Sequence, residues 1–372
     1  MSWFDVDRTG LAAILERRGK AFAVNELVQN AWDAGAHNVS IVLTPIDGAP
    51  QAMLIVEDDS AEGFVNLDES FTLFAKSRRA ADPLKRGRFC LGEKLVIALC
   101  REASIISTTG GIRFDADGTR HRINQTRERG TRFVAVIRMT RSELAEVQTD
   151  IARLISPAGV DTIFNGAAIL RPVLLATFQA KLPTELADAD GNLRRSMRTA
   201  TVEAFASDSS GEILELGIPV CAADWPWRLN VLQKVPLGME RDSVTDAFRR
   251  ALQVAAVNAL ADTIDPEQAA TPWASEAMGD SRATADAIQH LVTQRFGERP
   301  VIAVPGDPIA NATAEATGCH VIHGGALSAD AWANIRKHQL MPSTSQAFPT
   351  PKPSADAPTV KVCPLCKQPI RA

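Results

Sequence analysis

The feature that most constrains the fold is a predicted helix, residues 21–34, that carries two opposed stripes of side chains. Apolar residues at i, i+3, i+4 and i+7 form one buried face, and these are Val24, Leu27, Val28 and Ala31. Glu26, Asn30 and Asp33 fall at i, i+4 and i+7 and share a stripe about 60° wide on the opposite side. The helix therefore packs on a core with one side and presents carboxylate and amide oxygens with the other.

This polar stripe has two interpretations. A solvated helix face would explain the spacing alone. Solvated faces favour Lys and Glu, however, whereas this stripe combines two carboxylates with an amide. A hard Mg²⁺ ion takes oxygen ligands of this kind, and a neighbouring carboxylate can orient an attacking water molecule. The content of the stripe therefore favours a functional site.

Strands and glycine turns are expected around this helix. Gly35 is placed to end the helix, because a left-handed residue after the last turn costs glycine little. Alternating or clustered apolar residues predict four strands within the first 140 residues: 39–43, 53–56, 103–108 and 131–138. The second strand delivers Asp58 into a loop, and Gly130-Thr131 opens the last one.

Four short segments, in this order, resemble the ATP-binding boxes of the GHKL superfamily, which contains gyrase, heat-shock chaperones, histidine kinases and MutL. In chain order they are Glu26-x-x-x-Asn30-x-x-Asp33-Ala34, Asp58 with Gly63-Phe64, Gly87-Arg88-Phe89-Cys90-Leu91-Gly92-Glu93-Lys94, and Gly130-Thr131. The third segment is most similar to the type IIB topoisomerase B subunit. Two positions depart from the pattern, since Ser60 and Cys90 stand where glycines are expected.

The resemblance implies a role for each box. Glu26 would be the general base that activates water, Asn30 the Mg²⁺ ligand, and Asp33 a support for the site's hydrogen bonds. Asp58 would take the adenine amino group, and Thr131 would help to hold adenine or its bound water.

The third box is a glycine-rich turn that feeds a helix N-terminus, where backbone N–H groups can meet phosphate oxygens. Its expected nucleotide-binding residues are Gly87, Phe89, Leu91, Gly92 and Lys94, joined by Gly63 of the second box. The basic segment from Phe74 to Lys85, which includes Lys76, would form a lid over ATP.

Residues 231–237, followed by Arg241-Asp242 and a helix from Val244 to about Ala261, resemble the transducer domain of gyrase, MutL and the type IIB topoisomerase. In that domain a loop lysine reaches the γ-phosphate, and Lys234 would be that residue here. An exposed lysine at a strand end is the alternative. Strands are also expected at residues 213–220 and 229–235.

The C-terminal part has a different character. A helix near 281–296 and a strand–turn–helix–strand pattern after residue 300 predict a small α/β unit. Prolines among Ser, Thr and Ala then indicate a linker. Cys363 and Cys366 are half of a Zn²⁺ site, which Cys319, His320 and His323 or a second chain could complete; a flexible tail is the alternative.

The predicted fold is therefore α+β. A Bergerat α/β sandwich is expected in residues 1–140 and a ribosomal-S5-like transducer in 141–265. A small α/β region in 266–340, a disordered Pro-rich linker in 341–362 and a CxxC tail in 363–372 follow.

Composition narrows the function. The net charge of −4 gives no global attraction to nucleic acid, and the local Lys and Arg runs can be solvated faces. No apolar window is long enough for a membrane span, and a cytoplasmic protein is expected. None of the six histidines precedes Glu26, which disfavours a histidine kinase, and the absence of tyrosine means that a topoisomerase would need a separate partner subunit.

The resemblance to superfamily members with a transducer implies a protein that uses ATP and Mg²⁺ to close a homodimer and hydrolyses ATP slowly. DNA or DNA-bound proteins are the first expected client. A chaperone-like ATPase that acts on proteins and a non-hydrolysing nucleotide-binding scaffold are the alternatives.

Overall fold

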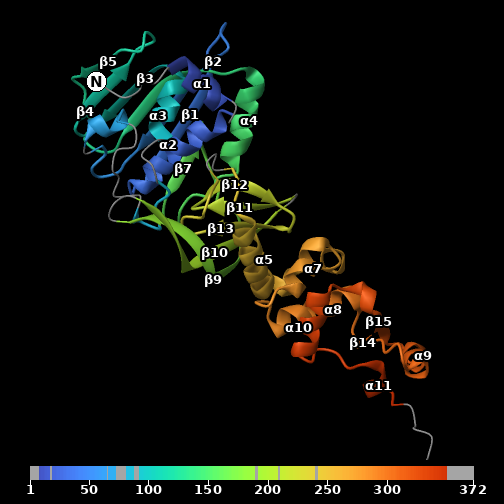
Figure 1. Ribbon diagram of the computed structural model, residues 1–372. Coiled ribbons are helices and arrows are strands. Elements are labelled where there is room, and N and C mark those ends of the chain that lie inside the picture. The colour runs from blue at the N-terminus through green and yellow to red at the C-terminus, as the bar shows by residue number, and fades with distance from the viewer. Residues whose placement is uncertain are drawn as a thin grey trace, which may run out of the picture. The chain divides into compact units, whose positions relative to one another are not determined.

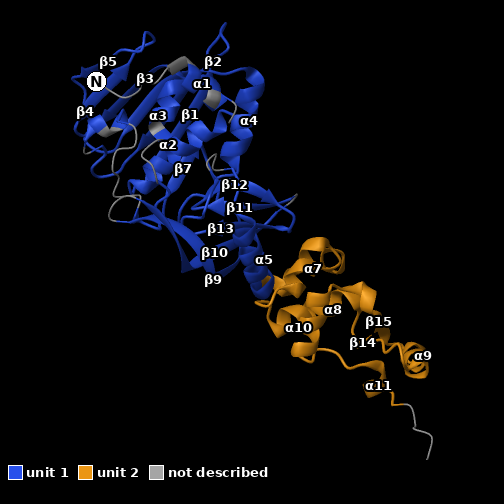
Figure 2. Ribbon diagram, in the orientation of Figure 1, with its two compact units in different colours: residues 1–259 blue, residues 260–372 orange. Residues whose placement is uncertain are grey.

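The computed structural model describes residues 8–16, 19–64, 66–72, 81–87, 92–188, 192–207, 210–238 and 242–349. The chain divides into two compact units, residues 1–259 and 260–372 (Figure 2). The fold is α+β, as predicted. Among the described residues, no helix combines the length and the apolar character that crossing a membrane requires.

An eight-stranded sheet forms the first part of unit 1 (Figure 1). Its order is β5-β4-β3-β6-β2-β1-β7-β8, with β1 and β7 parallel and the other neighbours antiparallel. The strands are β1 Asn38–Pro45, β2 Gln51–Asp58, β3 Cys100–Ser107, β4 Gly110–Phe114, β5 Arg120–Ile123, β6 Arg132–Arg138, β7 Asp161–Phe164 and β8 Ala167–Ala168. This sheet continues past residue 140, the domain end expected from the sequence.

Four helices cover one face of this sheet (Figure 1). They are α1 Arg8–Glu16, α2 Ala21–Asp33, α3 Gly92–Leu99 and α4 Arg141–Ala152, and a 3₁₀ turn, η1, spans Leu67–Ser70. The predicted helix is α2, and its apolar stripe is buried against the sheet. Gly35 has φ of 78° and ends the helix as predicted.

A five-stranded sheet of order β12-β11-β13-β10-β9 forms the second part of unit 1. Its strands are β9 Leu174–Ala187, β10 Leu193–Ala206, β11 Gly211–Glu215, β12 Ile218–Ala223 and β13 Trp227–Val231, and the predicted helix follows as α5 Asp246–Leu260. The fourteen-residue strands β9 and β10 were not predicted. Residues 194–199 of β10 are exposed on both faces, so the sequence there carries no alternation of apolar and polar residues.

The prediction of a single strand over residues 213–220 is wrong, because β11 and β12 form a tight hairpin there. Leu216 and Gly217 make the turn, with φ of 51° and 86°. Two-residue hairpin turns of this kind need positive φ at both positions. Gly217 also approaches Ile155 so closely that an added Cβ would lie 2.0 Å from the Ile155 carbonyl oxygen. A leucine in place of the usual Asn or Asp concealed the turn.

Unit 2 contains the predicted small α/β element. Its strands β14 Pro300–Ile302 and β15 His320–Ile322 pair in parallel, and helix α9 Pro308–Ala316 connects them along the chain. The other elements are η3 Ala261–Thr263, which begins at the boundary, α6 Pro266–Ala269, α7 Pro272–Gly279, α8 Ala285–Phe296, η4 Gly324–Ala326, α10 Ala329–Lys337 and α11 Thr344–Ala347.

Residues 341–349 differ from the linker expected there. Ser343 and Gln346 form a capping box at α11, and the Thr344 hydroxyl donates to Asn311 Oδ1 at 2.6 Å. Thr344 is fully buried, so this stretch packs on unit 2 despite its composition. The remainder of the expected linker, residues 350–362, lies outside the described residues.

A pair of neighbouring residues on β2 tests the core of the first sheet. Leu54 is fully buried, whereas Met53 on the opposite face is 38% exposed. We expect Leu54→Ala to lower the free energy of unfolding by about 2–5 kcal/mol through lost burial and a cavity. Met53→Ala, the control, should change it by roughly 0.5 kcal/mol or less. Urea unfolding checks both, and equal effects would contradict the described orientation of β2.

Candidate functional site

The polar stripe of α2 points into the protein. Glu26 and Asp33 are 8% and 7% exposed, and Asn30 lines a pocket. Buried carboxylates are costly unless they are hydrogen-bonded or paired. The solvated-face interpretation is therefore wrong.

The pocket lies between α2 and the strands β2, β3 and β6. Its walls are largely apolar and include the polar side chains of Asn30, Asp58 and Thr131. The lining residues are Leu27, Asn30, Ala31, Ala34, Val56, Asp58, Gly63, Phe64, Ile105, Thr131 and Phe133. One cavity thus brings together residues of three sequence boxes: Asn30 of the first, Asp58 and Gly63 of the second, and Thr131 of the fourth. A largely apolar pocket whose lining includes a carboxylate and a hydroxyl suits a heteroaromatic ring that carries hydrogen-bond donors.

The Asp58 carboxylate is held by the residue that replaces the expected glycine. Ser60 donates to Asp58 Oδ1 twice, from its backbone N–H at 2.9 Å and from its hydroxyl at 2.5 Å. The backbone N–H of Asp58 donates to the Thr131 carbonyl at 3.0 Å, which joins the second box to the fourth. Burial raises the pKa of Asp58 above its ordinary value, although the Ser60 hydrogen bonds oppose this shift.

The adjacent Asp59 has a different environment. It accepts hydrogen bonds from the backbone N–H groups of His37 and Asn38 at 2.8 and 2.9 Å, and from the Asn38 side chain at 2.8 Å. These bonds, led by that of the Asn38 side chain, lower the pKa of Asp59 to about 2. Asp59 thus fastens the start of β1, whereas Asp58 faces the pocket.

Three glycines allow the boxes to approach one another. A Cβ on Gly92, the first residue of α3, would lie 2.0 Å from Glu26 Oε2. A Cβ on Gly130 would lie 1.8 Å from the Asp58 carbonyl oxygen, and one on Gly63 would lie 2.3 Å from Ser107 Oγ. Gly63 and Gly130 also have positive φ, of 58° and 72°. The backbone of α3 therefore reaches the Glu26 carboxylate, and a side chain at position 92 would require the Glu26 side chain to move.

Asp33 links the first box to the third. Its two carboxylate oxygens accept the backbone N–H groups of Arg86, at 3.2 Å, and of Gly87, at 3.0 Å. Asp33 therefore positions the chain that enters the glycine-rich turn. The N–H of Gly87 points to Asp33 in this arrangement and not to the pocket.

Two of the expected lysines, Lys94 and Lys234, are not among the residues that line this pocket. Lys94 is buried and lines a second pocket together with Phe71, Arg101 and Arg120. Lys234 is fully buried on the loop after β13, and its backbone N–H donates to the Pro83 carbonyl at 2.8 Å. The alternative of an exposed strand-end lysine is therefore wrong for Lys234.

Several expected residues lie outside the described part of the chain. These are Lys76 with most of the expected lid, Phe89 and Leu91 of the third box, and Cys363 and Cys366. Within the part that is described, no three His, Cys, Asp or Glu side chains group as a metal site. This includes Cys319, His320 and His323; the His320 ring instead packs against Phe296 at 5.5 Å between centroids.

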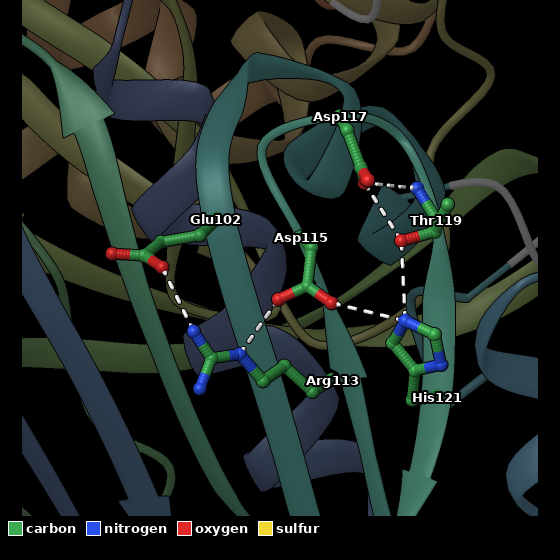
Figure 3. A network of polar contacts seen from close by, with 6 residues as sticks. All are labelled: Glu102, Arg113, Asp115, Asp117, Thr119 and His121. Carbon is green, nitrogen blue, oxygen red and sulfur yellow. Dashed lines mark hydrogen bonds and ion pairs between the residues drawn. The ribbon is translucent and has the colours of Figure 1, made fainter.

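A second polar cluster surrounds the β4–β5 turn (Figure 3). His121 Nε2 lies 3.3 Å from Asp115 Oδ2 and 3.2 Å from the Thr119 hydroxyl. A nucleophile–histidine–aspartate relay needs its two partners on different ring nitrogens, whereas here both contact Nε2. Arg113 further engages Asp115 at 2.8 Å and Glu102 at 3.3 Å. The cluster is mostly exposed and fastens the hairpin at the edge of the sheet.

The sequence did not indicate some residues that shape the site. Ser107 ends β3, and its Oγ accepts the Phe64 N–H at 2.5 Å and lies 3.4 Å from the Thr131 hydroxyl. Arg86 forms a buried ion pair with Glu215 at 2.5 Å. Ser107 ends an ordinary apolar strand, and 129 positions separate the two members of the ion pair. Neither contact follows a local pattern.

A known protein family matches the part of the chain that contains this pocket. The family described as "Histidine kinase-, DNA gyrase B-, and HSP90-like ATPase" matches residues 19–150. No curated protein matches the sequence. Two structures of the ATPase region of Saccharomyces cerevisiae topoisomerase II are distantly similar. The one bound to ICRF-187 (dexrazoxane) is 9% identical, covering 62% of this chain and 79% of that chain at a TM-score of 0.39. The other is 10% identical, covering 62% and 78% at a TM-score of 0.39.

The neighbouring carboxylates predict opposite effects of pH on stability. Because the pKa of Asp58 is raised on folding, its ionised form opposes folding, and Asp58→Asn should stabilise the protein at neutral pH. This gain should shrink as the pH falls through the raised pKa. The low pKa of Asp59, about 2, stabilises the fold above about pH 4, and this contribution is lost towards pH 2. Asp59→Asn should therefore destabilise at neutral pH.

Urea unfolding of wild type, Asp58→Asn and Asp59→Asn between pH 7 and about pH 3 measures both effects. Each variant is the control for the other, since the substitutions are identical and adjacent. Destabilisation by Asp58→Asn at pH 7 would contradict a raised pKa at this position.

Proposed function

We propose that this chain, whose residues 19–150 belong to the GHKL ATPase superfamily, binds ATP in the pocket beside α2 and hydrolyses it with the help of Mg²⁺. One observation carries the proposal: the backbone at Gly92 approaches the buried Glu26 carboxylate. The start of α3 and a candidate general base therefore share one site, one helical turn from Asn30. A phosphate group at a helix N-terminus meets backbone N–H groups and the favourable end of the helix dipole.

The adenine end is assigned to Asp58 and Thr131. The Asp58 carboxylate accepts the exocyclic amino group, and the Thr131 hydroxyl supports it directly or through water. Leu27, Val56 and Phe133 flank the ring with apolar surface. The acceptor at Asp58, the hydroxyl at Thr131 and the apolar walls fit a purine.

The phosphate end is assigned to Asn30 and Glu26. Asn30 would supply an oxygen ligand for Mg²⁺, and the ion would neutralise the triphosphate charge. Glu26 orients a water molecule and takes its proton, which is the role of a general base. Lys234 is assigned to the γ-phosphate, in line with the sequence resemblance, as a compact charge on a long stem.

If ATP binds one conformation of the protein more tightly than another, it shifts the population towards that conformation. We assign this protein an ATP-gated cycle in which two copies close on ATP, with DNA or a DNA-bound protein as the client. The resemblance of residues 231–242 to a transducer supports this assignment.

Replacing the proposed base should separate binding from turnover. Glu26→Gln keeps the volume of the side chain and removes its basicity, so we expect ATP turnover to fall by roughly 10²–10⁴-fold while a non-hydrolysable analogue still binds. Glu146→Gln, on the exposed face of α4, is the control and should leave both unchanged. Phosphate release and isothermal titration measure the two quantities. Full turnover in Glu26→Gln would remove Glu26 from the mechanism.

The proposed cycle predicts a change of assembly with nucleotide. Size-exclusion chromatography with light scattering should show wild type moving towards a dimer on addition of the analogue. Asp58→Asn, which impairs adenine recognition, should remain unchanged. If neither protein binds the analogue, the nucleotide assignment is wrong.

The client is tested by DNA retention with and without the analogue over a range of salt. A DNA clamp should retain DNA in an analogue-dependent manner that weakens as salt rises. If DNA is not retained and the protein suppresses aggregation of an unfolded substrate with ATP, the chaperone-like alternative holds.

A further inference from the structure

A buried arginine joins parts of unit 1 that are distant in the sequence. Arg86 is 4% exposed, and its Nε donates to Glu215 Oε2 at 2.5 Å. Glu215 ends β11 of the second sheet and is fully buried. Arg86 Nη1 also donates to Gln29 Oε1 at 3.4 Å, on the helix that carries Glu26 and Asn30. One guanidinium therefore contacts the nucleotide-site helix and the second sheet.

The backbone around Arg86 is held between the same two elements. The N–H groups of Arg86 and Gly87 donate to Asp33 on α2. On the other side, the Pro83 carbonyl accepts the N–H of Lys234 at 2.8 Å. The segment 83–87 thus bridges α2 and the loop after β13, and it enters the glycine-rich turn directly.

Glu215 completes the bridge from the second sheet. Its Oε2 accepts the hydrogen bond from Arg86 Nε, and its Oε1 accepts the N–H of Val235 at 2.9 Å. The buried Thr184, on β9, in turn donates its hydroxyl to the Lys234 carbonyl at 2.7 Å. A single carboxylate therefore fixes both Arg86 and the loop that carries Lys234.

A buried ion pair is weak evidence for stability, because well-packed apolar residues often serve as well. Directional contacts, however, determine position. A shift of segment 83–87 relative to α2 must move Arg86 or break its bonds, and either event acts on the Glu215 carboxylate and on the Lys234–Val235 backbone.

We propose that Arg86 and Glu215 couple occupancy of the α2 pocket to the position of the Lys234 loop and the second sheet. This inference rests on the proposed function, because it names how the nucleotide site would control the rest of unit 1. Arg86 and Glu215 are positioning residues and touch no reacting atom. Two sites are coupled when the ligand of one changes the equilibrium of the other.

Hydrogen exchange of the full chain, with and without a saturating non-hydrolysable ATP analogue, tests the coupling. In wild type we expect slower exchange both in residues 26–34 and in residues 229–236. In Arg86→Lys, which keeps the charge but not the fork of donors, and in Glu215→Gln, protection of 26–34 should persist. Nucleotide-dependent protection of 229–236 should fall by about tenfold. Saturation makes the result independent of changes in affinity.

Glu212→Gln is the matched control. Glu212 lies on the same strand and is also buried in ion pairs, with Arg153 and Arg228, but its contacts do not involve segment 83–87. It should retain nucleotide-dependent protection of both regions. Should either single variant fail to fold, as judged by thermal unfolding, the double variant Arg86→Met/Glu215→Leu removes both charges together and should show the same uncoupling.

The outcomes separate the two proposals. If 26–34 is protected and 229–236 keeps full protection in the variants, the coupling is wrong and the nucleotide assignment stands. Protection of only 26–34 in wild type also overturns the coupling. If the analogue protects neither region of wild type, the proposed function fails and the coupling fails with it.

Discussion

The structure depends on a helix that is buried on both of its sides. The apolar stripe of α2 packs on the first sheet, and its polar stripe is also withdrawn from solvent. Carboxylates in such a place need partners, and the chain supplies backbone N–H groups to Asp33 and the close backbone of α3 to Glu26. These contacts bring Gly87 and Gly92 to the helix.

Much of the first part of the fold could be predicted, because its signals are local. The period of α2, the alternation of β1 and the glycine after the helix each follow from a few neighbouring residues. The order of the boxes then predicted a shared site, and Asn30, Asp58 and Thr131 do line one pocket. Ser60 shows the limit of matching residue by residue, since a serine in a glycine's place holds the carboxylate by two hydrogen bonds.

The second part was harder, because its contacts join distant positions. The exposed strands β9 and β10 lack a periodic signal, and Leu216-Gly217 hides a hairpin turn. The sequence around Lys234 fitted a surface residue as readily as a functional one, but Lys234 is fully buried and its backbone is hydrogen-bonded to Pro83 and Thr184. No local pattern contains information of that kind.

The parallel pairing of β1 with β7 has a practical consequence for dissecting this protein. Strand β7 follows α4, so a fragment that ended at residue 150 would leave the β1 edge without its neighbour. It would also lose Asn165, whose side chain accepts from the Leu43 N–H and donates to the Leu43 carbonyl. A bare edge of alternating Val, Ile and Leu is a template for pairing with other chains. An isolated first domain should therefore extend to residue 168 to stay free of aggregation.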